Sequence, residues 1–298
     1  MVYSCVGAGR HRTCRADVLE LRTMNMTDDS ATQCVLITGA SSGIGAGLAR
    51  EFCARGMRVA LVARRIEQLE TLAAELRSAG GRASAHRGDV TIDGDLAAIV
   101  RVLAAEGVTP HIVVANAGFG VVGDARNLTL EDYRRQFETN VYGVLRTFHE
   151  TIVGLSASRG RFVIMGSVAG YLSGAGSSAY SMSKFAVRAL AESLHGELRA
   201  AGVGCTLISP GFVDSDIRRV DNHGGLHAEV KDPVPAWLRM ETRKAARIMV
   251  RGILRGRKEV IVTLHARVIV FMTRNLPRLT RWLLLRANQR SRPEPKLS

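Results

Sequence analysis

The chain has 298 residues, of which 46% are hydrophobic and 23% charged, which is ample for one large α/β domain and thin for two. Its net charge of +14 is concentrated at one end, since the stretch 239–298 holds 16 Lys and Arg against 3 Asp and Glu. No segment approaches the ~18 apolar residues of a membrane-spanning helix, so a transmembrane protein is excluded.

Residues 1–30 have neither a hydrophobic period nor the apolar run of a signal peptide. We interpret them as a disordered leader or as the product of a translation start placed too early. The cysteines are scattered and form no CxxC pair, which argues against a disulfide framework or a zinc site. We therefore expect no metal and a cytoplasmic protein; the five cysteines are Cys5, Cys14, Cys34, Cys53 and Cys205.

Short apolar runs then alternate with longer amphipathic segments. The runs predict buried strands at 34–38, 58–63, 111–115, 161–165, 203–209 and 259–263, with a weaker candidate at 82–87. The amphipathic segments predict helices near 43–55, 65–79, 92–106, 129–156 and 178–200. This alternation is typical of a doubly wound α/β fold, in which helices cover both faces of a parallel sheet.

The segment 212–240 breaks this alternation, with paired glycines, two prolines and late apolar residues. A long loop inside a compact domain is usually functional or disordered. Because it follows the end of a predicted strand, we interpret it as a lid over a substrate.

Three glycines, Gly39, Gly43 and Gly45, stand between the first strand and the first helix. Glycine permits a tight turn and lets the backbone approach a pyrophosphate, which then rests on the positive end of the helix. Ser41 and Ser42 add hydroxyl donors. The turn therefore favours dinucleotide binding over a plain strand-to-helix connection.

The second strand ends at Ala63 without a carboxylate, and Arg64 and Arg65 follow it. In dinucleotide folds an acidic residue about 20 positions after the glycines holds the ribose 2′-hydroxyl, whereas an arginine accommodates a 2′-phosphate. We predict that Arg64 binds this phosphate with Arg65 as a helper, so that NADP(H) is preferred and NAD(H) is the alternative. The plainer interpretation is a solvated pair of arginines that opens a helix.

Tyr180 and Lys184 stand four residues apart, on one face of a predicted helix. A neighbouring ammonium favours the phenolate and moves the phenol pKa from about 10 toward neutrality, where it can exchange protons with an alcohol or carbonyl. Ser167 follows the strand 161–165, where its hydroxyl is placed to bind the substrate oxygen. Alone, such a Tyr–Lys pair is often only an exposed helical pair.

In order and spacing, the motifs between Gln33 and Ser215 resemble the short-chain dehydrogenase/reductase family. The resemblance implies a Rossmann fold with a mostly parallel seven-stranded sheet, and an NAD(P)-dependent oxidoreductase that interconverts a carbonyl and an alcohol. The residues that carry it are Thr38–Gly45, Asn116–Ala117–Gly118, Asn140, Ser167, Tyr180 with Lys184, and Pro210–Gly211.

The resemblance implies that Asn140, Ser167, Tyr180 and Lys184 are the catalytic residues. Tyr180 would transfer the proton, Ser167 would orient the reacting oxygen, Lys184 would lower the tyrosine pKa and bind the ribose, and Asn140 would hold a relay water. The expected substrate contacts are Ser167 and Tyr180. The expected cofactor contacts are Gly39, Ser41, Ser42, Gly43, Ile44, Gly45, Arg64, Asp89, Val90, Asn116, Ala117, Gly118, Tyr180, Lys184, Pro210, Gly211, Val213 and Ser215.

Structural interpretations of some of these residues stay open. Asp89 fits turn chemistry before a helix, Asn140 fits a residue that interrupts a helix, and Asn116 fits one that fixes the backbone. Two other functions also stay open, a non-catalytic NADP(H)-binding sensor or membrane-associated scaffold, and an NAD-linked alcohol dehydrogenase. The family habit implies a homodimer or homotetramer through the helices 129–156 and 178–200, and the apolar lid favours a hydrophobic carbonyl substrate.

We expect the catalytic domain to cover 31–263 and a basic amphipathic extension to cover 264–298. Two apolar runs in the extension, 266–273 and 276–285, are punctuated by arginines. Helices with Trp and Leu on one side and Arg on the other suit a membrane interface, and one of two open interpretations is that the cytoplasmic protein is peripheral at a membrane. The alternative is that the apolar face docks on the domain or on a second subunit. Nucleic-acid binding is not expected, because interleaved aromatic residues are absent.

Overall fold

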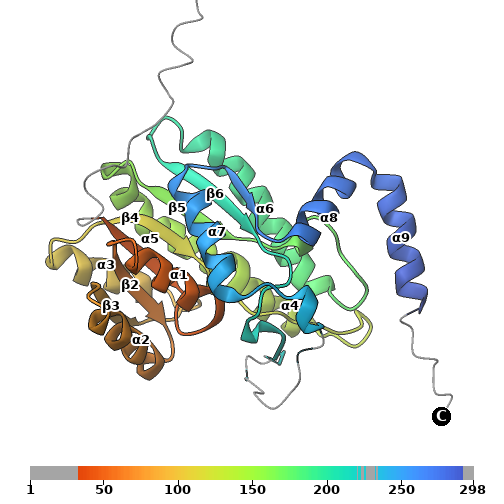
Figure 1. Cartoon of the computed structure of the whole chain (residues 1–298), viewed down its shortest axis with the longest axis horizontal. Coiled ribbons are helices and arrows are strands. Elements are labelled where there is room, and N and C mark those ends of the chain that lie inside the picture. Colours follow the sequence, from red (N-terminus) through yellow and green to blue (C-terminus); the bar gives the residue numbers. More distant parts are fainter. Residues whose placement is uncertain (1–32, 220, 223–224, 226–231, 233, 291–298) are drawn as a thin grey trace, which may run out of the picture.

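The computed structural model describes residues 33–290 except 220, 223–224, 226–231 and 233 (Figure 1). The leader expected at 1–30 therefore lies outside the described residues, as do residues 291–298. The described part contains one seven-stranded sheet in the order β3-β2-β1-β4-β5-β6-β7, and every strand pair is parallel. The strands are β1 Cys34–Thr38, β2 Arg58–Ala63, β3 Ala83–Arg87, β4 Pro110–Ala115, β5 Arg161–Met165, β6 Gly204–Ser209 and β7 Glu259–Ile261.

Helices cover both faces of this sheet, so the expected doubly wound α/β fold is confirmed. The α-helices are α1 Gly43–Cys53, α2 Ile66–Ser78, α3 Asp95–Ala105, α4 Leu130–Phe137, α5 Gly143–Ala157, α6 Ser178–Glu197, α7 Thr242–Leu254, α8 Leu264–Asn275 and α9 Pro277–Arg290. A π-helical turn, η1, covers Glu138–Tyr142, and short 3-10 turns are η2 Val168–Gly170, η3 Asp216–Arg219 and η4 Ala236–Leu238. The expected single helix over 129–156 is therefore divided into α4, η1 and α5.

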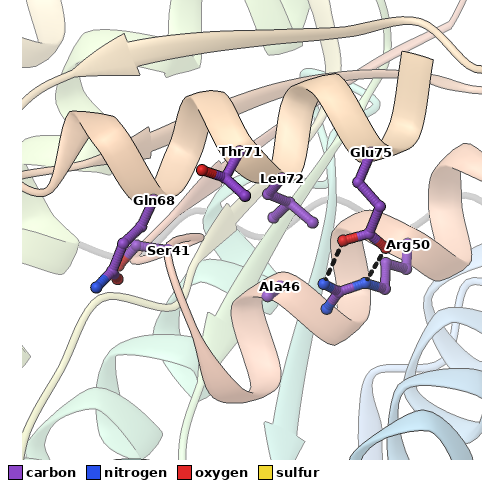
Figure 2. Close-up of a pocket in the computed structure, with 7 residues that line it drawn as sticks. All are labelled: Ser41, Ala46, Arg50, Gln68, Thr71, Leu72 and Glu75. Atoms are coloured by element: carbon purple, nitrogen blue, oxygen red, sulfur yellow. Dashed lines mark hydrogen bonds and ion pairs between the residues drawn. The ribbon is translucent and has the colours of Figure 1, made fainter. Parts of the chain in front are cut away.

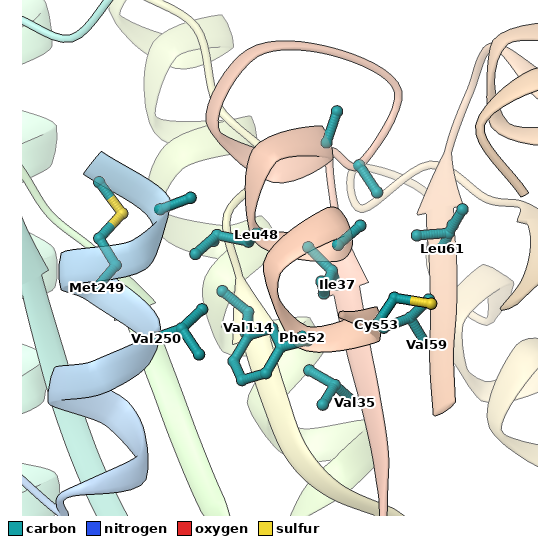
Figure 3. Close-up of a cluster of buried hydrophobic side chains, with 14 of the residues drawn as sticks. Val35, Ile37, Leu48, Phe52, Cys53, Val59, Leu61, Val114, Met249 and Val250 are labelled. Atoms are coloured by element: carbon teal, nitrogen blue, oxygen red, sulfur yellow. The ribbon is translucent and has the colours of Figure 1, made fainter. Parts of the chain in front are cut away.

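The strands are continuous apolar runs because each is buried on both faces. Along β1, Val35 and Ile37 pack on the side of α1, α2 and α7, while Cys34 and Leu36 pack on the side of α3, α5 and α6. Figure 3 shows the first of these layers, in which Phe52 of α1 lies between the sheet and helix α7.

The order of the strands reverses direction at β1, and this reversal determines where the candidate site lies. The chain first adds β2 and β3 on one side of β1 and then returns to add β4 on the other side. In open α/β sheets, ligands bind at the carboxyl ends of the strands at such a switch point. The residues that follow β1, β4, β5 and β6 all lie at the carboxyl ends of the strands, on one side of the sheet, because the strands are parallel.

Replacing Phe52 tests this packing. Its side chain is fully buried, so we expect Phe52→Ala to lower the free energy of unfolding by about 3–5 kcal/mol, as large-to-small changes in cores do. Leu130→Ala on α4, where the side chain is 74% exposed, is the control and should cost less than about 0.5 kcal/mol. Equal losses in chemical denaturation would contradict the described core.

Candidate active site

The glycine turn connects Thr38 at the end of β1 to α1, and two close contacts leave no room for side chains. Gly39 has φ +65°, and a Cβ added there would lie 2.7 Å from the Cα of Ala117. A Cβ on Gly45 would lie 2.3 Å from the carbonyl oxygen of Gly39. The turn is therefore a concave stretch of backbone, with Ile44 packed partly against the core beneath it.

Hydrogen bonds from Thr38 and Asn116 join the ends of β1 and β4. The Thr38 hydroxyl accepts from the backbone N–H groups of Asn116 (3.0 Å) and Ala117 (3.1 Å), and it donates to the carbonyl of Val114 (3.3 Å). The Asn116 side-chain amide donates to the carbonyls of Thr38 (2.9 Å) and Gly39 (3.1 Å). Asn116 thus fixes backbone, and the sequence interpretation missed the central position of the buried Thr38 hydroxyl.

The loop after β6 reaches the other side of the glycine turn. A Cβ added to Gly43 would lie 3.3 Å from the Cβ of Ser215. Ser42 is the N-cap residue of α1 and has an extended backbone, and its side chain makes no capping hydrogen bond. The Ser42 side chain therefore satisfies none of the first N–H groups of α1, and a helix N-terminus favours an anion.

The two arginines after β2 take different positions. Arg65 donates through Nη2 to the hydroxyls of Ser41 (2.9 Å) and Ser42 (3.1 Å), so it lies along the glycine turn. The Arg64 side chain is 69% exposed, with Nη1 4.0 Å from Oδ2 of Asp89. From sequence spacing we expected Arg64 to be the main contact of a 2′-phosphate. The contact of Arg65 with the two serines was not predicted.

Asp89 and Val90, expected near the adenine, have structural contacts of their own. Oδ1 of Asp89 accepts from the backbone N–H (2.9 Å) and the hydroxyl (2.8 Å) of Thr91, which is turn chemistry. Val90 is buried, and a Cβ on Gly143 would lie 2.7 Å from its side chain. Asp89 is therefore held rigidly beside Arg64 by its neighbours.

A pocket of about 260 Å³ lies between α1 and α2 (Figure 2). Ser41 lines one end, and the other end is closed by Arg50, which donates to both carboxylate oxygens of Glu75 at 2.7 Å. None of the expected catalytic side chains lines it. This pocket adjoins the glycine turn and is separate from the reacting groups.

Ser167, Tyr180 and Lys184 meet at the carboxyl ends of β5 and β6. Ser167 caps η2 by accepting from the N–H of Ala169 (3.1 Å), and its hydroxyl lies close enough to the Tyr180 side chain to lower the phenol pKa. One turn along α6, the Lys184 ammonium donates to the carbonyl of Met165 (2.9 Å) and lies 5.7 Å from the centroid of the Tyr180 ring. The structure thus brings the serine, tyrosine and lysine together.

Burial shifts the pKa values of both titratable groups. It raises the pKa of Tyr180, while the hydrogen bond from Ser167 and the positive charge of Arg218 lower it. Burial lowers the pKa of the Lys184 ammonium to about 8. Arg218 is itself held by Asp232, whose carboxylate it contacts at 2.5 Å, and sequence analysis did not identify it.

Asn140 lies in the π-helical turn η1 and is buried. Its Oδ1 accepts from the N–H of Phe119 (3.1 Å), and its Nδ2 donates to the carbonyl of Phe119 (3.0 Å) and to the Ser183 hydroxyl (3.1 Å). Ser183 in turn donates to the carbonyl of Tyr180 (2.7 Å). Asn140 therefore both interrupts a helix and connects it to the helix of Tyr180; π turns of this kind are frequent at functional sites.

Gln136, four residues before Asn140, completes the support of the loop after β4. It accepts from the N–H of Val121 (2.6 Å) and donates to the carbonyl of Phe119 (2.9 Å). A Cβ on Gly120 in this loop would lie 3.5 Å from the Tyr180 ring, so the loop forms a wall beside that ring. The four-residue spacing of Gln136 and Asn140 places both amides on one face of a helix, and the structure buries them there.

The loop after β6 is fixed from two directions. The carbonyl of Pro210 accepts from the N–H of Val168 (2.9 Å), and the N–H of Phe212 donates to Nε2 of His265 (2.9 Å). A Cβ on Gly211 would lie 2.2 Å from the same nitrogen. Val213 is buried and pairs with Met240 across the expected lid, much of which lies outside the described residues. Sequence analysis gave His265 no role.

The amino-acid sequence is similar to those of known proteins of one family. A family model described as short chain dehydrogenase matches residues 33–224. An uncharacterized oxidoreductase of Myxococcus xanthus is 37% identical over 243 residues, which are 81% of this chain and 92% of that protein.

Two solved structures show the same fold. A short-chain dehydrogenase from Sphingobium yanoikuyae in complex with NADPH has a TM-score of 0.69 and 28% identity, covering 89% of this chain and 98% of the other. A short chain dehydrogenase/reductase from Burkholderia phymatum in complex with NAD has a TM-score of 0.74 and 24% identity, covering 85% and 96%. These neighbours bind one or the other nicotinamide cofactor.

The chain belongs to the short-chain dehydrogenase/reductase family, as the order of its motifs predicted. It is an NAD(P)-dependent oxidoreductase with a Rossmann-type sheet. Within the described part of the chain, no helix combines the length and apolarity needed to cross a membrane.

The buried ammonium of Lys184 predicts a pH dependence of stability. Its pKa falls from 10.5 to about 8 on folding, so between these pH values the unfolded chain holds the proton that the folded chain has lost. Stability contributed by this site therefore rises with pH, by up to about 3 kcal/mol at 1.36 kcal/mol per pKa unit.

We expect the free energy of unfolding of the wild type, relative to Lys184→Met, to rise between pH 8 and pH 10.5. Lys244→Met on α7, where the side chain is exposed, is the control and should show a flat difference. A flat difference for Lys184→Met as well would show that the ammonium is not buried as described.

Proposed function

We propose that this protein is an NADP(H)-dependent oxidoreductase that interconverts a carbonyl and an alcohol, with Tyr180 as the acid and base. One observation carries the proposal. The Ser167 hydroxyl lies beside the Tyr180 side chain, where it opposes the rise in the phenol pKa, and the Lys184 ammonium lies 5.7 Å from the centroid of the Tyr180 ring. Both groups lie at the end of the sheet that also holds the glycine turn.

The residues around the turn fit a dinucleotide. Gly39 and Gly45 let the turn pack tightly on itself and on the loop after β4, so that the chain enters α1 directly from β1. In dinucleotide folds a pyrophosphate rests on the helix N-terminus that follows such a turn. Loop 210–215 lies against the turn through Ser215. We assign the pyrophosphate to Gly43 and the serines, and the nicotinamide to Pro210–Ser215.

The protein's own groups would then handle the proton. The bound nicotinamide supplies or accepts the hydride at the carbonyl carbon. Tyr180 donates its phenol proton to the carbonyl oxygen during reduction and takes it back during oxidation, while Ser167 holds that oxygen by a hydrogen bond. The ammonium of Lys184 stabilises the phenolate that remains.

Asn140 and its partners position these groups. The Asn140 amide connects Phe119 to Ser183, and Ser183 holds the backbone of Tyr180, so the phenol is fixed relative to the loop after β4. We propose that Asn140 also holds a water through which protons reach Lys184. Preorganisation of this kind lowers the cost of assembling the reacting geometry.

The preference for NADP(H) rests on charge at the end of β2. Arg64 and Arg65 stand where NAD-selective dinucleotide folds place a carboxylate, and Arg65 already contacts the turn serines. Arg64 is exposed and free to turn toward a 2′-phosphate, at the loss of only a 4.0 Å contact with Asp89. We therefore assign the 2′-phosphate to Arg64, with Arg65 beside it and the adenine near Asp89 and Val90.

We extend the proposal to a hydrophobic carbonyl substrate. Phe212 lies in the loop 210–215, stacked on His265 at 5.2 Å between ring centroids, and Trp237 is exposed in the segment 212–240. Aromatic side chains in the segment that leads away from the candidate site favour a substrate whose remaining surface is apolar.

We also propose that subunits pack through α5 and α6 to form a homodimer or homotetramer. Both helices expose apolar side chains, Val153 on α5 and Met182 and Phe185 on α6. Exposed apolar patches on a soluble domain commonly mark such contacts.

Tyr180→Phe tests the catalytic role. The variant lacks the proton donor but keeps the ring, so we expect turnover to fall by about 10²–10⁴-fold while NADPH affinity stays unchanged. NADPH oxidation, followed by absorbance over a panel of ketones, aldehydes and quinones, gives turnover. Tyr133→Phe on α4 is the matched control, because its hydroxyl contacts Ser178 and not Ser167.

Turnover in Tyr180→Phe equal to the wild type would contradict the proposal. A wild-type protein that binds NADPH tightly but stays silent over the whole panel would instead favour a non-catalytic sensor or scaffold.

Arg64→Gln tests the cofactor preference. Loss of a charge-assisted hydrogen bond worth about 1.5–3 kcal/mol should weaken NADPH binding by about 10–100-fold and leave NADH binding unchanged. Arg82→Gln, which precedes β3 at the amino ends of the strands, is the control and should change neither affinity. Isothermal titration with both cofactors is the measurement. Equal NADPH affinities in the wild type and in Arg64→Gln would favour the NAD-linked alternative.

A further inference from the structure

The chain ends, within the described residues, in a pair of helices outside the sheet. Helix α8 follows β7 directly, and α9 begins at Pro277, where the chain turns back along α8. In Figure 1, α9 stands away from the body of the protein, with α8 between them. We call α8 and α9 the C-terminal hairpin, and this inference does not depend on the proposed function.

One face of α8 fixes the hairpin to the domain. Ala266 and Val270 are buried, and Arg274 donates to the carboxylate of Glu259 on β7 (2.9 Å). The Arg274 guanidinium also lies 5.4 Å from the ring centroid of Tyr171, whose hydroxyl bonds the same carboxylate. The orientation of α8 is therefore set by buried and charged contacts.

The outward face of α8 is apolar. Leu264, Val268 and Phe271 repeat at spacings of four and three residues, so they form one stripe, and all three are exposed. Arg267, on the flank of the stripe, is exposed as well. Phe271 leaves 61% of its surface open, which is unusual for a large apolar side chain in a stripe.

Helix α9 repeats this combination. Leu279, Trp282 and Leu283 are exposed at helical spacing, and Arg278 and Arg281 are exposed beside them. The guanidinium of Arg286 lies 4.5 Å from the ring centroid of Trp282. Tryptophan and arginine together suit the boundary between lipid chains and headgroups, because each joins an apolar body to a polar end. Exposed apolar residues also flank this set at Leu276 and Leu285.

The charge of the hairpin indicates what covers it. Residues 264–290 contain six arginines and no aspartate or glutamate. A second copy packed on the same face would bring arginines against arginines, whereas anionic headgroups would neutralise them. We propose that the C-terminal hairpin docks this protein on an anionic lipid bilayer.

The lengths of the helices set the mode of docking. With 12 and 14 residues, α8 and α9 are about 18 and 21 Å long, shorter than the ~30 Å hydrocarbon core. The hairpin therefore lies in the interface with its apolar stripes inserted among the lipids. Because α8 starts at the carboxyl end of β7 and His265 holds Phe212, the docked surface adjoins the candidate active site.

Flotation of the full-length protein with vesicles tests this proposal. We expect binding to vesicles of phosphatidylcholine and phosphatidylglycerol, little binding to phosphatidylcholine alone, and loss of binding at high salt. Arg278→Gln with Arg281→Gln should weaken binding by about 20–30-fold, since each basic residue near an anionic surface contributes about a factor of five. The control, Arg243→Gln with Arg247→Gln, removes the same charge from the exposed side of α7 and should bind as the wild type does.

Two further variants separate insertion from charge alone. Trp237 and Trp282 are the two tryptophans of the chain, and both are exposed. In Trp237→Phe, the remaining Trp282 should shift its emission to the blue when anionic vesicles are added. Phe271→Ser should weaken flotation, whereas Val102→Ser on α3, whose side chain is also exposed, should not.

The proposal is overturned if the hairpin variants float as the wild type does, or if Trp282 emission does not move. It is also overturned if light scattering shows that these variants lose a dimer, which would make a second copy the occupant, or if the wild type prefers duplex DNA to the vesicles. NADPH binding measured without vesicles reports the proposed function separately, and it should be equal in all of these variants.

Discussion

The joint between β1 and β4 is the contact on which the site depends. Thr38 and Asn116 exchange hydrogen bonds across the two strand ends, and the same bonds hold the backbone of Gly39. The glycine turn leads from one side of this joint, and the loop that faces the Tyr180 ring leads from the other. A buried threonine hydroxyl with three backbone partners thus fixes the glycine turn relative to the loop beside the Tyr180 ring.

Much of the sheet could be predicted because its strands are buried on both faces. The ends of β1, β2 and β5 agree with the apolar runs residue by residue, since a glycine or an arginine directly follows each run. Strand β7 is two residues shorter than predicted, as expected at an edge. Helix α7 was not predicted, although Ala245, Ala246, Met249, Val250 and Ile253 recur at helical spacing between basic residues and form the face that packs against α1. The sequence therefore carried an amphipathic signal for this helix.

Part of the candidate site could likewise be predicted from the sequence, and part could not. Spacing in the sequence indicated that Tyr180, Lys184 and Ser167 would meet, because a helical turn and a strand end bring such residues to one edge. It could not show that Asn140 lies in a π turn, since that depends on its contacts with Phe119 and Ser183. Nor could it show that His265 supports the loop after β6, because the two are far apart in the chain and only the tertiary fold brings them together.

The central claim is that the phenol of Tyr180 faces a nicotinamide held between the glycine turn and loop 210–215. A crystal structure of the full-length protein with NADPH tests this most directly. The account predicts density for the pyrophosphate at the N-terminus of α1 and for the nicotinamide ring beside Tyr180 and Ser167, with the 2′-phosphate at Arg64. A dinucleotide bound elsewhere, or a nicotinamide ring pointing away from that phenol, would contradict it.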